Sequence, residues 1–148
     1  MIDRIEFYRT SDAYGEFSNF APYPLEIEGR VWPTSEHYFQ AQKFPADPEH
    51  QEAIRRQASP MIAAEMGRDR SKPLRADWEQ VKDAIMTAAV RTKFAQHPEL
   101  AELLLSTGEA TLVEHTKNDA YWADGGDGSG KNMLGKILMQ IRQELRGK

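Results

Sequence analysis

The 148-residue sequence contains no cysteine, and its histidines are few and scattered. The lack of cysteine excludes disulfides, thiolate nucleophiles and cysteine-ligated zinc. The histidines show none of the spacings that a metal site requires; they are His37, His50, His97 and His115. We therefore expect neither a bound metal nor another cofactor.

The sequence also lacks an excess of positive charge and any long apolar run. Its net charge of -4 at pH 7 argues against non-specific binding to nucleic acids or membranes. The N-terminal segment is charged throughout, so we expect neither a signal peptide nor a membrane span. These features predict a cytoplasmic protein in which any basic site is local. No pattern in the sequence predicts an oligomeric state.

The length and the ordinary composition favour one globular domain over residues 1–148, large enough to bury a core without disulfides or metals. Alternating apolar residues predict a strand at residues 2–8, in which Ile2, Ile5 and Phe7 are the buried positions. Residues 111–115 favour another short strand. Residues 25–32 are predicted to form a hairpin that turns at Glu28-Gly29.

Cap residues and prolines mark the expected helices. Thr34 or Ser35 can begin a helix that covers the stretch up to residue 44. Asp77 and Gln80 resemble a capping box for the longest helix, which we expect to be central. The other helices are expected at residues 48–57, 60–67, 98–107 and 131–146, and the longest at 78–96.

The stretch Trp32–Phe44, WPTSEHYFQAQKF, carries the most suggestive chemistry. Glu36, Gln40 and Lys43 recur at i, i+4 and i+7 and so share one helix face. One interpretation is a solvated stripe in which Glu36 merely complements the positive helix start. The other is a partly buried acid and amine with shifted proton affinities, because aromatic residues crowd the stripe.

Two loops are unusually aromatic. Residues 17–24, FSNFAPYP, either pin a surface loop into the core or form a pocket wall in which Asn19 offers its amide to a ligand. Residues 116–131 carry Asp119 and the pair Tyr121-Trp122 in a polar, glycine-rich setting. Such a pair usually faces a ligand or plugs the core.

Four cations lie within eight residues: Arg68, Arg70, Lys72 and Arg75. In an acidic chain they form either a solvated turn or a seat for a phosphate group. Trp78 follows in the first turn of the longest helix, where it is either a hydrophobic staple or a stacking surface for a planar ring.

The segment Gly125–Lys131 has the spacing G-x-x-x-x-G-K of a phosphate-binding loop, but Asn132 follows in place of serine or threonine. The hydroxyl that would bind magnesium is therefore missing, and the glycines follow a polar loop instead of a buried strand. The acids of this loop also lack the register of an EF-hand. We reject both a nucleotide hydrolase and a calcium site here.

Several blocks together resemble the YbiA-like family, also called the NADAR family of N-glycosidases. The blocks are WPTSEHYFQAQKF, SPMIAAEMGRDRSKPLR, LVEHTKNDAYW and GKNMLG, and the similarity runs from about Phe7 to Leu145. The resemblance implies a compact, mainly helical α+β domain with a small antiparallel sheet.

The resemblance also implies an activity. The YbiA branch, which this chain is most similar to, hydrolyses ribosylaminopyrimidine 5′-phosphates of early riboflavin synthesis and releases ribose 5-phosphate and the aminopyrimidine. Related domains remove ADP-ribose from guanine, and a noncatalytic ADP-ribose or nucleotide-binding module is the alternative from another class. The expected partner is a phosphorylated small molecule in each case.

Site residues follow from the same resemblance. Glu36 matches the family's acid, Lys43 its helix lysine, and Trp78 and Trp122 its ring-binding tryptophans. Ala123 and Asp127 depart from the glycine and the variable residue expected in relatives. The full prediction comprises catalytic Glu36, Lys43 and Asp119, with substrate bound by Asn19, Arg68, Arg70, Lys72, Trp78 and Trp122.

Two mechanisms suit such a bond. In one, a neutral Lys43 attacks C1′ and expels the base, and Glu36 moves the protons around the resulting Schiff base. In the other, Glu36 activates water directly, and Lys43 orients that water or binds the sugar. The sequence leaves both open.

Overall fold

The computed structural model describes residues 3–147 and shows a mainly helical α+β fold. Its strands form one antiparallel pair and one parallel pair. This confirms the predicted class, including the small antiparallel sheet. The chain divides into two compact units, Met1–Ala21 with His97–Lys148, and Pro22–Gln96. A single domain over residues 1–148 stays a prediction.

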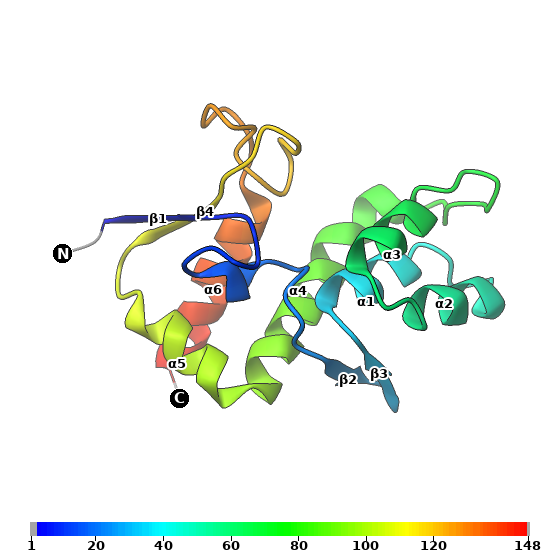
Figure 1. The fold of residues 1–148 in the computed structure, drawn as a ribbon, viewed down its shortest axis with the longest axis horizontal. Helices are drawn as coiled ribbons and strands as arrows, with labels where there is room; N and C mark the ends of the chain where they lie inside the picture. The colour runs from blue at the N-terminus through cyan, green and yellow to red at the C-terminus, as the bar shows by residue number, and fades with distance from the viewer. Residues whose placement is uncertain (1–2, 148) are drawn as a thin grey trace. The chain divides into compact units, whose positions relative to one another are not determined.

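The first unit, Met1–Ala21 with His97–Lys148, contains the parallel strand pair. Strand β1 (Arg4–Phe7) pairs with β4 (Thr111–Glu114), and α6 (Met133–Arg146) packs against β4 and α5 (Pro98–Ser106) (Figure 1). A short 3-10 helix, Gly15–Phe17, follows β1. Ile5 and Phe7 are buried as predicted, whereas the prediction for Ile2 lies outside the described residues.

Asn132 has a structural role after Gly125–Lys131, the segment whose spacing resembles a phosphate-binding loop. Its backbone is left-handed, with φ 52°, a conformation that asparagine tolerates better than serine or threonine. Its side chain accepts from the N–H of Glu114 at 3.0 Å and donates to the carbonyl of Leu112 at 2.9 Å. The N–H of Gly130 donates to the carbonyl of Asp124. These groups join the loop to β4 and α6.

The second unit, Pro22–Gln96, contains the hairpin and four helices. Strands β2 (Leu25–Ile27) and β3 (Arg30–Trp32) are antiparallel. Glu28 and Gly29 between them both have positive φ, 54° and 81°, which matches the twist of a tight hairpin and confirms the predicted turn. The helices are α1 (Ser35–Ala41), α2 (Pro48–Arg55), α3 (Pro60–Gly67) and α4 (Trp78–Gln96).

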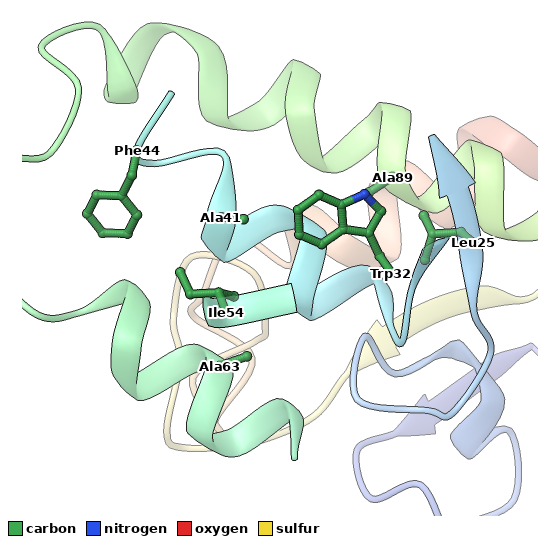
Figure 2. Packing of buried hydrophobic residues seen from close by; sticks show 7 residues of the cluster. All are labelled: Leu25, Trp32, Ala41, Phe44, Ile54, Ala63 and Ala89. Atoms are coloured by element: carbon green, nitrogen blue, oxygen red, sulfur yellow. The ribbon is translucent and has the colours of Figure 1, made fainter. Parts of the chain in front are cut away.

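Helix α1 lies at the centre of this unit, in contact with α2, α3 and α4. A buried apolar cluster holds these elements and the hairpin together; its members are Leu25, Trp32, Ala41, Phe44, Ile54, Ala63 and Ala89 (Figure 2). Trp32 is also in edge contact with the ring of Tyr38, with centroids 5.5 Å apart. Among residues 3–147, no helix combines the length and the apolar character needed to cross a membrane.

Three of the predicted helix starts are confirmed by side-chain caps. The Thr34 hydroxyl accepts from the N–H of His37 at 3.1 Å, and the side chains of Asp47 and Ser59 cap α2 and α3 in the same way. The predicted capping box at α4 is wrong, because the carboxylate of Asp77 binds the guanidinium of Arg75 instead.

Helix α1 is shorter than predicted. It ends at Ala41, with Gln42 as its C-cap, and Lys43 lies in the turn that follows. Pro45 explains this end, because the residue before a proline is disfavoured in the helical region. Lys43 therefore lies in the turn that follows α1 and not in the helix itself.

Candidate functional site

Glu36 and Lys43 lie together with three neighbours in the second unit. We call this group the α1 cluster: Glu36, Gln40, Lys43, Gly67 and Trp78. The three polar side chains are buried, since Glu36, Gln40 and Lys43 are 9%, 5% and 8% exposed. The interpretation of a solvated stripe is therefore wrong, and the partly buried acid and amine are what the fold contains.

Gln40 is the neighbour that contacts Glu36 most closely. Its Nε2 donates to Oε2 of Glu36 at 2.7 Å, across one turn of α1. The carbonyl oxygen of Gln40 is buried and has no hydrogen-bond partner among the described residues. Such an unsatisfied group costs about 1–3 kcal/mol. The amide is thus oriented for Glu36 at the expense of its own carbonyl.

Gly67 leaves the space that Gln40 occupies. A Cβ at this position would overlap with Oε1 of Gln40 and lie 2.7 Å from its Cδ. The backbone of Gly67 is not in the left-handed region that favours glycine. Glycine is therefore required here for space, where α3 approaches α1.

Lys43 lies against aromatic rings. Its Nζ is 5.6 Å from the ring centroid of Trp78 and 5.9 Å from that of Phe39, and it is 3.5 Å from the carbonyl oxygen of Gly67. Burial lowers the pKa of the Lys43 amine to about 8. The positive charges of Arg70, Arg68 and Lys82 act in the same direction, and the charge of Glu36 opposes them.

This pKa changes what the amine can do. An ordinary lysine, with a pKa of 10.5, is almost entirely protonated near neutral pH, whereas a pKa of about 8 leaves roughly a tenth of the amines neutral at pH 7. Only a neutral amine is a nucleophile. The α1 cluster therefore contains both a carboxylate and an amine suited to nucleophilic chemistry.

The four cations between residues 68 and 75 differ in their surroundings. Arg75 is held within the fold, since its guanidinium binds Asp77 and the carbonyl of Gln42, and its N–H donates to the carbonyl of Lys43. Arg68 and Arg70 are exposed, and their charges act on Lys43. Lys72 is half-buried. Arg75 is a structural residue of this segment, and phosphate binding by the others stays a prediction.

Trp78 forms the wall beside Lys43. It is 7% exposed, and its ring packs on Phe39 with centroids 5.0 Å apart and planes inclined by 57°. The indole is therefore largely covered by its own neighbours. Stacking of Trp78 on a ligand ring stays a prediction.

The other predicted site residues belong to the first unit. Asn19 is 7% exposed and follows the short 3-10 helix. Asp119 shapes its own loop, because its Oδ1 accepts the N–H groups of Tyr121 and Trp122, both at 2.8 Å. The rings of Tyr121 and Trp122 meet edge to face, with centroids 4.9 Å apart. The predicted roles of Asn19, Asp119 and Trp122 stay predictions.

A polar network in the first unit was not predicted from the sequence. His115 Nδ1 lies 2.7 Å from Oδ2 of the buried Asp124, and this contact raises the pKa of His115. The other oxygen of Asp124 accepts the N–H groups of Thr116 and Gly126. Arg4 lies 3.9 Å from the same carboxylate. Asp124 therefore joins the start of the loop that follows β4, at Thr116, to the glycines near its end.

The sequence did not reveal the surroundings of two further residues, Gln40 and Lys93. Gln40 was recognised only as a member of the stripe, because its contact with Gly67 joins distant parts of the chain. Lys93 is 1% exposed, with its Nζ 5.7 Å from the ring centroid of Tyr23. Its position three residues after Val90, on the buried face of α4, was the signal that could have revealed it.

Comparison with known proteins agrees with this picture. A model of the NADAR domain matches residues 6–146. N-glycosidase YbiA of Escherichia coli is 63% identical over 95% of this chain and 88% of its own length. A riboflavin biosynthesis protein of Vibrio vulnificus is 43% identical over 99% of this chain and 40% of its own.

The solution structure of Escherichia coli YbiA is similar to this fold. It superposes with a TM-score of 0.90 at 62% sequence identity and covers 99% of this chain and 87% of that one. The sequence matches and this structural match extend over nearly the whole chain and agree with one another. The chain therefore belongs to the NADAR domain family.

Proposed function

We propose that this protein is the N-glycosidase that hydrolyses ribosylaminopyrimidine 5′-phosphates, early intermediates of riboflavin synthesis, to the aminopyrimidine and ribose 5-phosphate. The observation that carries the proposal is the buried Lys43, with a pKa of about 8, in the same cluster as Glu36. N-glycosidase chemistry is supported by the name of the relative at 63% identity. The riboflavin pathway is supported by the name of the relative from Vibrio.

In the mechanism that we propose, the first half of the reaction transfers the sugar to Lys43. The ribosylamine opens to an imine at C1′, with cleavage of the bond to O4′ and protonation of that oxygen. The neutral Nζ of Lys43 then adds to C1′. Glu36 carries two protons in turn from Nζ to the departing nitrogen, the first as Nζ adds and the second as the aminopyrimidine is expelled. The aminopyrimidine leaves, and C1′ remains joined to Lys43 as a Schiff base.

The second half of the proposed reaction releases the sugar. Glu36 removes a proton from a water molecule as that water adds to C1′ of the Schiff base. Glu36 passes this proton to Nζ, which gives a carbinolamine. When the carbinolamine collapses, its C1′–Nζ bond breaks, the hydroxyl proton moves to Nζ, and Lys43 leaves as the free amine. The product is ribose 5-phosphate in its aldehyde form, which closes to the ring. One water molecule is consumed in each cycle, and no redox step occurs.

The test of this function is a product assay. Purified protein incubated with the ribosylaminopyrimidine 5′-phosphate should release ribose 5-phosphate and aminopyrimidine in equal amounts. In parallel, a DNA strand that carries ADP-ribosylated guanine should stay intact. Release of ADP-ribose from that strand, with no action on the pyrimidine, would place the protein with the guanine-directed enzymes. Binding of ADP-ribose without turnover of either substrate would make it a binding module.

Arg70 is expected to serve both the phosphate group and Lys43. Arg70→Gln should weaken binding of the 5′-phosphate much more than binding of the dephosphorylated nucleoside, because only the phosphate loses a charge-assisted contact. It should also raise the pKa of Lys43, since Arg70 is the charged neighbour that lowers it most. The pH–rate profile should therefore shift toward higher pH.

The matched control for this prediction is Arg56→Gln. Arg56 is an exposed arginine paired with Glu52 on α2, and its charge is not among those that lower the pKa of Lys43. KM for both ligands and the pH–rate profile should stay at the parental values in this variant. Equal losses for phosphate and nucleoside in Arg70→Gln would make Arg70 structural.

A further inference from the structure

Glu36 can transfer protons only if its carboxylate is held in one orientation, and the fold provides a device for this. We propose that Gln40 is the positioning residue that holds Glu36, and that Gly67 makes this possible by leaving room for the Gln40 side chain. The inference rests on the proposed function, in which Glu36 moves the protons.

The orientation of the Gln40 amide is set by Glu36. In the observed orientation, Nε2 donates to Oε2 of Glu36 at 2.7 Å and the carbonyl oxygen stays unsatisfied in the interior. Turning the amide over would place two acceptor oxygens against each other while Glu36 is ionised. The fold therefore leaves a buried carbonyl without a partner in order to donate to the carboxylate.

Gly67 is the second, independent part of the device. Alanine would be a better helix former than glycine in α3, and the backbone at Gly67 has no positive φ that would call for glycine. A Cβ at this position would nevertheless collide with the amide of Gln40. The absence of a side chain at position 67 is thus matched to the presence of a long one at position 40.

The hydrogen bond should also act on the chemistry of Glu36. A donor on the carboxylate favours the ionised form, which is the form that accepts a proton. Further cations contribute to the field in this region: Lys43 beyond the end of α1, Arg68 and Arg70 after α3, and Lys82 on α4. None of them changes when Gln40 is replaced. A shift in the titration of the Glu36 carboxyl group, followed by carbon-13 NMR, would therefore report on Gln40 itself.

Gln40→Met tests the inference, since methionine keeps the length of the side chain and removes the donor. We expect kcat to fall about 10- to 100-fold, as misplaced catalytic groups typically cause, while KM changes little. The midpoint of the Glu36 carboxyl titration, followed by carbon-13 NMR, should move to higher pH. The melting temperature should change little, because losing the donor to Glu36 is destabilising while removing the unsatisfied carbonyl is stabilising. Gln57→Met removes a half-buried glutamine that follows α2 and donates to the carbonyl of Ala53, and it should leave all these values unchanged.

Gly67→Ala reaches the same bond from the other side. Its methyl group should push the Gln40 amide away from Glu36 and reproduce the loss of kcat. In the double variant with Gln40→Met, the second change should add little to the kinetic loss, because both changes break one interaction. If Gly67→Ala does not fold, Gln40→Met alone decides.

Parental kcat or an unshifted titration of the Glu36 carboxyl group in Gln40→Met would overturn the inference. Its failure is distinguishable from failure of the proposed function. Failure of the parent protein to release ribose 5-phosphate would refute the proposed function, and an active Glu36→Gln variant would remove Glu36 from the mechanism. An inactive Glu36→Gln beside a normal Gln40→Met would refute only the role of Gln40.

Discussion

Glu36→Gln should reduce turnover by about 10²–10⁴-fold or abolish it, because an amide cannot take up the protons that the reaction moves. The folded state should stay within about 1 kcal/mol of the parent protein. Glutamine has the same size, and its carbonyl can still accept the hydrogen bond from Gln40 Nε2 that Glu36 accepts now. Loss of activity without loss of stability is expected for a residue that takes part in the reaction.

Because Glu36 is charged, Glu36→Gln distinguishes two roles of this residue that predict opposite changes in activity. The carboxylate raises the pKa of Lys43, so its removal should leave a larger fraction of that amine neutral. If Glu36 acted only through its charge, the variant would therefore be as active as the parent or more active near pH 7. Proton transfer predicts the opposite sign. Steady-state kinetics and thermal unfolding decide between them, with the exposed Glu65→Gln on α3 as the control.

Local features of this fold were predictable from the sequence, because nearby residues determine them. The caps at Thr34 and Ser59, and the positive φ of Glu28 and Gly29, depend on residues only a few positions away. One local prediction failed: Arg75 competes for the side chain of Asp77, which therefore does not cap α4. A capping pattern in the sequence does not show which other partner lies near.

Pairings between distant residues were not predictable in this way. The parallel register of β1 and β4, in which Arg4 is opposite Thr111, depends on a pairing that no local pattern encodes. The same holds within the α1 cluster. Aromatic neighbours indicated that Glu36 and Lys43 are buried, whereas the contact of Gln40 with Gly67 appears only when α1 and α3 pack.

Lys43 should form a covalent adduct with the sugar during turnover. Borohydride added to the reacting mixture should reduce the Schiff base and fix a sugar phosphate on the protein, and peptide mass mapping should place it on Lys43. Lys43→Arg keeps a positive charge but cannot form the imine, so it should be inactive and should trap no sugar. An active Lys43→Arg would leave the direct attack of water, led by Glu36, as the mechanism.

The stability of Lys43→Met should move in the opposite direction from its activity. Because the folded state lowers the pKa of Lys43 from 10.5 to about 8, keeping this amine protonated is unfavourable in the fold. Below pH 8 the penalty is fully present, and replacing the lysine should raise the free energy of unfolding by on the order of 2–3 kcal/mol. Activity should be lost in the same variant.

The pH dependence of the stability gained in Lys43→Met shows whether the lowered pKa of Lys43 is its cause. Between pH 8 and 10.5 the unfolded chain holds the Lys43 proton and the folded protein does not, so the stability of the parent rises with pH relative to Lys43→Met. The advantage of the variant should therefore shrink across this window and be small above it. Denaturant unfolding of both proteins at pH 7 and at pH 10 measures the difference. A gain that is equal at both pH values would mean that methionine merely packs better, and that the fold does not hold Lys43 ready as a neutral nucleophile.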